Sequence, residues 1–203
     1  MRRNNHANRN QIREHIAQLA ARLMAADGVQ DFSLAKRKAA RQLGADDTQN
    51  LPNNAEIELA LRNYHALYQR DEQHERLIEM RRQALAVMRE LAPFDPHLTG
   101  AVLSGTATRY SEVSLLLFTD SPKEVELYLL NRNFPFKRGE KRYRLGDTLQ
   151  SVPTLVISGG EHEGVALTIF SIAELHHAPR HADGRPVEKA RPPALEILLK
   201  AAG

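Results

Sequence analysis

A short stretch near the middle of the chain carries residue types that could contact a phosphate group and a divalent cation. It begins with the small residues Gly105 and Thr106 and continues to Glu112 and Ser114, which a single apolar residue separates. Backbone N–H groups at a turn of small residues can approach a phosphate closely. Alternate residues of a strand face the same side, so Glu112 and Ser114 would share one face. The stretch therefore predicts a phosphate-approach turn followed by a strand with one carboxylate and one hydroxyl.

The segment Leu103–Phe118 resembles the signature of the nucleotidyltransferase superfamily. In that signature a strand, a Gly-Ser or Gly-Gly turn and about ten further residues lead to an acidic–apolar–acidic run on the next strand. Gly105 and Thr106 then occupy the turn, Glu112 the first acidic position and Ser114 the second. The resemblance implies an α/β domain that binds a nucleotide at Gly105, Thr106 and Ser114, with Mg²⁺, the one cofactor suggested, held at Glu112.

The acidic set of the signature is incomplete in this chain. A Ser hydroxyl is neutral and a weak ligand for Mg²⁺, which prefers carboxylate and phosphate oxygens. The superfamily's third carboxylate lies on a later strand, and the run Val165–Phe170 contains no acid. We therefore expect a catalytically degenerate protein, a pseudoenzyme, that binds a nucleotide or a nucleic-acid-linked ligand. The alternative is an active metal-dependent nucleotidyltransferase that recruits Glu161 or Glu163, with Glu112 as its candidate catalytic residue.

A basic run surrounds Tyr143 and precedes the later strands. Its members are Lys137, Arg138, Lys141, Arg142 and Arg144. Two interpretations are open. Lys141 and Arg142 could bind the phosphates of a nucleotide, because Lys and Arg donate charge-assisted hydrogen bonds to phosphate. The run could instead form a charged hairpin edge, which discourages aggregation between strands.

A second basic cluster lies near the N-terminus and comprises Lys36, Arg37, Lys38 and Arg41. The region 17–44 resembles the opening of a tetracycline-repressor-type DNA-binding domain, in which an amphipathic helix and a Gly turn precede an Ala-rich basic helix. That resemblance implies contact between these side chains and nucleic-acid phosphates. A DNA-binding regulator is therefore one more alternative, and an adaptor that binds a protein partner through its helical half is another. A solvated helix face would also explain the cluster.

The elements that must position these residues are helical in the first half of the chain. Apolar residues recur there with the 3.6-residue period of a helix, as in Ile12, Ile16, Leu19, Ala20 and Leu23. Asp31 or Ser33 can cap a second helix. Asn53 with Glu56 is a capping-box-like start for a third. Pro93 and Pro96 end the helical half.

Downstream of Pro96, short apolar runs bounded by Gly, Pro or charged residues are typical of strands. These runs cover residues 101–103, 113–118, 154–157 and 165–170, with another extended stretch around Tyr143. Pro122 opens a helix between them, and residues 194–202 form a last one. We therefore predict an α+β protein, with a helical N-terminal domain at 1–95 and a small mixed α/β sheet domain of nucleotidyltransferase type at 96–203.

Composition narrows the class of protein. A chain of 203 residues that is 42% hydrophobic can bury one sizeable core or two small ones. The 28 basic and 25 acidic side chains give a net charge of only +3, which indicates no strong polyelectrolyte character. The absence of Cys excludes disulfides, thiolate metal sites and cysteine nucleophiles. No run approaches the roughly 18 apolar residues of a membrane span. We expect a soluble, cytoplasmic protein with no membrane partner.

Overall fold

The computed structural model describes residues 2–45, 50–68, 70–160, 162–176 and 179–202, with the backbone alone described at 2–9, 66–68 and 70–72. The chain divides into two compact units. The first, here called the helical unit, comprises Met1–Arg76 and Gly105–Ser111. The second, the sheet unit, comprises Leu77–Ser104 and Glu112–Gly203. The α+β class and the helical N-terminal region are as the sequence predicts.

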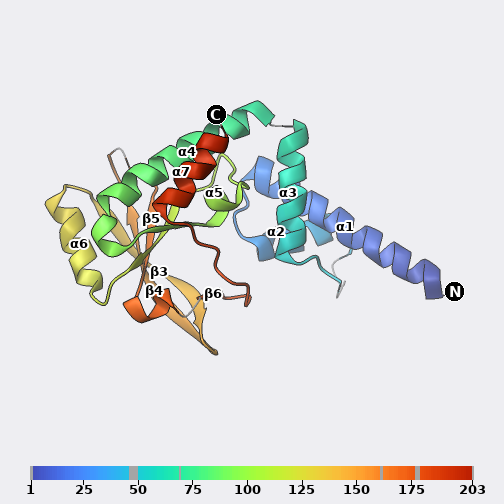
Figure 1. Ribbon diagram of the computed structural model, residues 1–203. Helices are drawn as coiled ribbons and strands as arrows, with labels where there is room; N and C mark the ends of the chain where they lie inside the picture. Colours follow the sequence, from blue (N-terminus) through green and yellow to red (C-terminus); the bar gives the residue numbers. More distant parts are fainter. Residues whose placement is uncertain (1, 46–49, 69, 161, 177–178, 203) are drawn as a thin grey trace. The chain divides into compact units, whose positions relative to one another are not determined.

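The helical unit is built on α1 (Arg2–Asp27), α2 (Phe32–Gln42) and α3 (Asn54–Tyr68). Figure 1 shows α3 crossing α1. Small side chains at the contacts let these helices approach one another, and larger apolar residues fill the remaining space. The buried set includes Ile16, Ala20, Ala21, Ala35, Ala39, Ile57 and Leu61. The 3.6-residue apolar period of the sequence is thus the buried stripe of α1.

Both predicted helix starts have the expected capping hydrogen bonds. The Asp31 side chain accepts a hydrogen bond from Leu34 N at 2.6 Å, so Asp31 caps α2. Asn53 N donates to Glu56 Oε2 at 2.7 Å, and Glu56 N donates to Asn53 Oδ1 at 2.9 Å. This reciprocal pair is a capping box, which satisfies two N–H groups that the first turn of α3 would leave unpaired.

The segment Gly105–Ser111 packs on the turn between α1 and α2. Arg109 Nη2 donates to Ala26 O at 2.8 Å, and Gln30 Nε2 donates to Tyr110 O. Gly28 ends α1 with a φ of 73°, and a Cβ there would lie 3.0 Å from the Tyr110 ring. Glycine is needed at this position for its left-handed backbone and for the closeness of the ring. These contacts place the segment in the helical unit.

The described residues of the sheet unit form a six-stranded sheet with the strand order β1-β2-β5-β4-β3-β6. Their bounds are β1 (His97–Thr99), β2 (Ser114–Phe118), β3 (Phe136–Leu145), β4 (Thr148–Ile157), β5 (Ala166–Phe170) and β6 (Arg180–His181). The β2–β5 pair is parallel and the other pairs are antiparallel, so the sheet is mixed as predicted. Strands β3 and β4 form a long hairpin whose turn uses Gly146 at a φ of 58°.

Helices complete the sheet unit. They are α4 (Arg70–Glu90), which begins in the helical unit, α5 (Gly100–Ser104), α6 (Pro122–Asn131), α7 (Pro192–Ala201) and the short 3₁₀ helices η1 (Ala92–Phe94) and η2 (Ile172–Leu175). Arg89 of α4 pairs with Glu196 of α7 at 2.8 Å, and Figure 1 shows the two helices beside one another. Pro122 stands in the first turn of α6, as predicted.

The prediction of a strand at residues 101–103 was wrong, because this run forms α5. Gly100 adopts a φ of 72° directly after β1 and turns the chain into the helix. The buried Arg81 of α4 then donates from Nε to Val102 O at 3.2 Å and from Nη2 to Leu103 O at 3.3 Å. A cation at the end of a helix stabilises carbonyl groups that have no partner within the helix.

One face of the sheet, here called the site face, carries the residues of interest. The alternation of side chains and the strand register place on it His97, Thr99, Ser114, Leu116, Phe118, Lys137, Gly139, Lys141, Tyr143, Leu145, Thr148, Gln150, Val152, Thr154, Val156, Ala166, Thr168 and Phe170. Part of this face is an apolar cluster that comprises Leu116, Phe118, Tyr143, Val152, Phe170 and Val187. The other part is polar and is described below.

Candidate functional site

Ser114 begins β2 on the site face, between two neighbouring strands. It lies opposite Thr99 of β1 and opposite Ala166 of β5. A Cβ at the exposed Gly100 would stand 3.8 Å from Ser114 Cβ, so the strand-to-helix turn next to this hydroxyl is the one at Gly100. No hydrogen bond to the half-buried Ser114 hydroxyl is found among the described residues. The hydroxyl is therefore available to a ligand.

Glu112 forms an ion pair with a lysine from a distant strand. Lys141 Nζ of β3 lies 3.2 Å from Glu112 Oε1, and the two side chains are 41% and 40% exposed. Strands β5 and β4 stand between β2 and β3 in the sheet, so this pair joins the two sides of the site face. The structure thus joins Glu112 to Lys141, with Ser114 two residues further along the chain from Glu112. These three residues are here called the polar cluster.

Hydroxyl side chains lie between β2 and β3 on the same face. Thr154 of β4 and Thr168 of β5 are 2% and 3% exposed, and their Oγ1 atoms are 3.4 Å apart. Being buried and bonded to one another, they form a floor and not a surface that contacts solvent. Within the described residues no group of three His, Cys, Asp or Glu side chains could hold a metal ion. Of the alternative acids, Glu163 is exposed in the turn before β5, and Glu161 lies outside the described residues.

Gly105 and Thr106, which the sequence assigned to the phosphate-approach turn, belong to the helical unit, whereas the polar cluster belongs to the sheet unit. Gly105 follows α5 with a φ of 78°. Gln73 Nε2 donates to Gly105 O and to Ala107 O, each at 3.3 Å. The side chain of Thr106 is buried, at 4% exposed. In this structure these residues terminate a helix and anchor a loop.

The basic run of β3 divides between the two faces of the strand. Lys141 points to the site face, and its neighbour Arg142 is exposed on the opposite one. Arg138 pairs with Glu126 of α6 through contacts of 2.7 and 2.8 Å, which lowers the pKa of the Glu126 carboxyl. Strand β6 pairs only with Tyr143 and Arg144 of β3, so much of the run lies along an edge. The run therefore has the placement of a charged hairpin edge, from which Lys141 alone reaches Glu112.

The basic cluster of α2 is mostly exposed. Arg37, Lys38 and Arg41 are exposed to solvent, with Arg37 and Arg41 one helical turn apart. Lys36 is half-buried, and its charge contributes to the lowered pKa of Glu56. Three of the four predicted nucleic-acid contacts are thus exposed and could face a polyanion, while Lys36 is half-buried.

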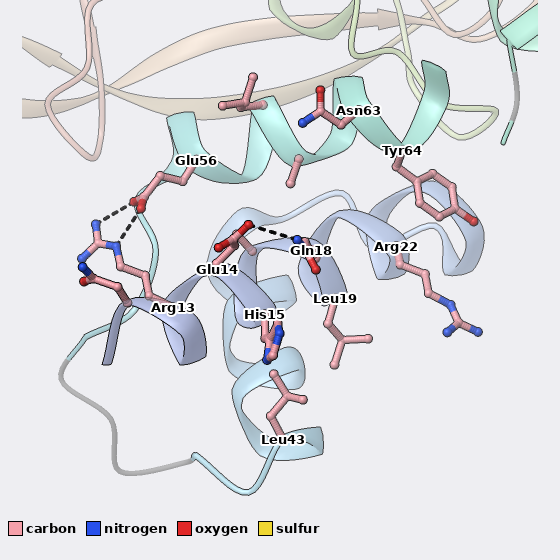
Figure 2. Close-up of a pocket in the computed structure, with 14 residues that line it drawn as sticks. Arg13, Glu14, His15, Gln18, Leu19, Arg22, Leu43, Glu56, Asn63 and Tyr64 are labelled. Carbon is pink, nitrogen blue, oxygen red and sulfur yellow. Dashed lines mark hydrogen bonds and ion pairs between the residues drawn. The ribbon is translucent and has the colours of Figure 1, made fainter. Parts of the chain in front are cut away.

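A groove of about 1310 Å³ lies in the helical unit and not at the polar cluster. Figure 2 shows Arg13 of α1 joined to Glu56 of α3, with contacts of 2.7 and 2.6 Å. This pair raises the pKa of Arg13 and lowers that of Glu56, so both groups stay charged. The remaining lining includes Arg22, Glu14 and the exposed Leu59. Its balanced charges select no particular ligand, and we assign no chemistry to it.

Sequence reasoning missed His97, which is 4% exposed at the start of β1. Its Nδ1 lies 2.8 Å from Asp95 O, and Arg191 Nε donates to its Nε2 at 3.1 Å. Burial lowers the pKa of His97, and the guanidinium of Arg191 needs an unprotonated Nε2 as acceptor. His97 is therefore a neutral, structural group. A single polar residue directly after Pro96 gives no signal of this in the sequence.

No protein-family model matches the chain, and no match to a curated protein or to a solved structure is found. In the part of the chain that the structure describes, no helix has an apolar stretch long enough to cross a membrane.

Proposed function

We propose that the sheet unit is a nucleotidyltransferase-like domain that binds a nucleotide or a nucleic-acid-linked ligand at the polar cluster and has lost the transfer reaction. The observation that carries the proposal is the placement of Ser114. This residue stands at the second acidic position of the signature, beside a strand–glycine–helix turn, with a neutral hydroxyl where the reaction needs a charge.

The order of elements supports this proposal. Strand β1, Gly100 and α5 precede a loop that leads to Glu112 and Ser114. The signature requires about ten residues between the small-residue turn and the first acid. The distance along the chain from Gly100 and Ala101 to Glu112 agrees with this number better than the distance from Gly105 does. The resemblance is therefore better supported when Gly100, and not Gly105, is assigned to the turn.

The chemistry of the donor set supports the loss of catalysis. Two-metal phosphoryl transfer needs carboxylates that share divalent ions. Glu112, two residues before β2, is the carboxylate that pairs with Lys141, whereas Thr168 and Ser114 on the site face are neutral and Glu140 of β3 alternates to the opposite face. A site of this kind can hold a phosphate group but cannot stabilise the charge of the transfer transition state.

Equilibrium dialysis of the full-length protein with ATP, GTP, CTP and UTP tests the proposal, together with an assay for label transfer from each nucleotide. We expect at least one nucleotide to bind and no label to be transferred. Failure of all four to bind at millimolar concentration, with and without Mg²⁺, would overturn the proposal. Label transfer that Glu112→Gln abolishes would show an active transferase instead.

A second candidate function is nucleic-acid contact through α2, which its exposed basic side chains favour. Each phosphate contact releases counterions, so binding should weaken steeply with salt. Fluorescence anisotropy with labelled duplex DNA and RNA measures the slope of log Kd against log salt. Arg37→Ala, Lys38→Ala and Arg41→Ala together should reduce that slope by about two to three, and Lys36→Ala should change it little. An unchanged slope in the triple variant would exclude α2 as the contact.

A further inference from the structure

The donor set at Glu112 does not fit the divalent cation that the nucleotidyltransferase resemblance implies. Mg²⁺ prefers an octahedral set of carboxylate, phosphate and water oxygens. Lys141 Nζ already lies 3.2 Å from Glu112 Oε1. A dication at the same carboxylate would be repelled by the ammonium group at this short range. The Ser114 hydroxyl contributes no negative charge to offset that repulsion.

The ammonium group of Lys141 stands beside Glu112, where the signature would place a metal cation. In the signature the carboxylates recruit a metal, and the metal then binds the phosphates. Here the chain supplies the cation itself, from β3. An ammonium group has three N–H donors, so Nζ can keep Glu112 and still donate to a phosphate oxygen. Because the Lys141 side chain is 41% exposed, a ligand from solvent can reach it.

The surroundings of Lys141 offer donors to an anion. The Ser114 hydroxyl is a second donor on the same face of the sheet. A Cβ at position 100 would lie 3.8 Å from Ser114 Cβ, so a side chain there could cover the hydroxyl. Because residue 100 is glycine, the hydroxyl is not covered from this side. The floor between β2 and β3 is formed by the small or hydroxyl-bearing Thr154, Ala166 and Thr168, and it adds no carboxylate.

We infer that the polar cluster binds the phosphate groups of its ligand without a divalent cation, with Lys141 Nζ in the place of the metal and the Ser114 hydroxyl as a second donor. The inference rests on the proposed function and names its ligand class, a nucleoside polyphosphate in its metal-free form. Glu112 keeps the ammonium group in position, and its negative charge beside Lys141 weakens the attraction between the ammonium group and the incoming phosphate.

Equilibrium dialysis of the full-length protein with inorganic triphosphate, in EDTA and in excess Mg²⁺, tests the inference. Triphosphate should bind in EDTA, and Mg²⁺ should weaken binding several-fold because it shields the phosphate charges. Lys141→Gln should raise the Kd in EDTA by about tenfold or more, whereas Lys141→Arg should retain most of the affinity. Glu112→Gln should tighten binding, since it removes a competing anion.

Arg142→Gln is the matched control, because it removes the same charge from the next residue of β3 on the opposite face. It should change the Kd by less than about twofold. Binding of triphosphate only in Mg²⁺ would overturn the inference and leave the proposed function standing. A nucleotide that binds while triphosphate does not, or an unchanged Kd in Lys141→Gln, would also overturn it. If neither triphosphate nor any nucleotide binds in either buffer, the proposed function fails as well.

Discussion

The polar cluster and the apolar cluster share one face of the sheet but differ in what holds them. The apolar cluster consists of rings and aliphatic side chains that are buried, with Phe170 only 2% exposed. The polar cluster is held by one ion pair between side chains that are each about 40% exposed. Burial supplies stability in proportion to apolar area, whereas exposed ion pairs supply little. We therefore expect the first cluster to maintain the sheet and the second to be free for ligand.

Phe170→Ala should have the largest effect on stability. Its ring lies 5.9 Å from the Phe118 ring and 5.1 Å from the Tyr143 ring, measured between centroids. Its removal leaves a cavity in the apolar cluster and should cost about 4 kcal/mol of unfolding free energy, with a Tm lower by roughly 10 °C. Urea unfolding followed by circular dichroism measures the loss. A cost below about 1 kcal/mol would show that this cluster does not maintain the sheet.

Thr168→Val should have an intermediate effect, because it leaves the buried Thr154 hydroxyl without its partner at 3.4 Å. An unsatisfied buried hydroxyl costs about 1–2 kcal/mol. The double variant Thr154→Val with Thr168→Val removes both polar groups and should recover most of that loss. The same unfolding assay compares the three proteins. A double variant that is less stable than Thr168→Val would show that the two hydroxyl groups do more than satisfy one another in the buried floor of the site face.

The pH dependence of stability should reveal His97, which packs edge-on against Phe118 of the apolar cluster at a ring distance of 5.2 Å. Burial lowers the pKa of His97 from its ordinary value of 6.5. Below about pH 6.5 the imidazole is therefore protonated in the unfolded chain but still neutral in the folded chain, which favours unfolding. Stability should fall as the pH drops from 7 toward 5. His97→Gln should flatten that decline. A decline of equal size in the variant would assign it to another group.

The two clusters also differ in how far the sequence predicts them. The caps at Asp31 and at Asn53 with Glu56 join neighbours in the chain, so spacing alone identifies them. The ion pair of Glu112 with Lys141 depends on the order of β2, β5, β4 and β3, which no local pattern specifies. The sequence named both residues as candidates but gave no reason to join them.

The glycine turns show a second limit. The sequence favours Gly105 as the phosphate-approach turn because Gly and Thr stand together after an apolar run that has the pattern of a strand. The run is helical because Gly100 turns the chain and Arg81 binds the carbonyls of Val102 and Leu103. The arginine comes from the preceding α-helix, α4, 21 and 22 residues before the two carbonyl groups, so this contact lies outside the range of a local sequence pattern.

Lys141→Gln and Glu112→Gln should have the smallest effects on stability, within about 0.5 kcal/mol of the unmodified protein, because an exposed ion pair is screened by solvent. Thermal unfolding of both variants checks this expectation. A loss of 2 kcal/mol or more in either would mean that the pair holds the sheet together, and the contrast between the two clusters would no longer hold.

Phosphorus NMR of inorganic triphosphate, added to the full-length protein in EDTA, tests the central claim most directly. The account predicts that the resonances broaden or shift with the unmodified protein and stay as in free triphosphate with Lys141→Gln. Resonances that respond equally to both proteins, or that respond to the unmodified protein only after Mg²⁺ is added, would contradict it.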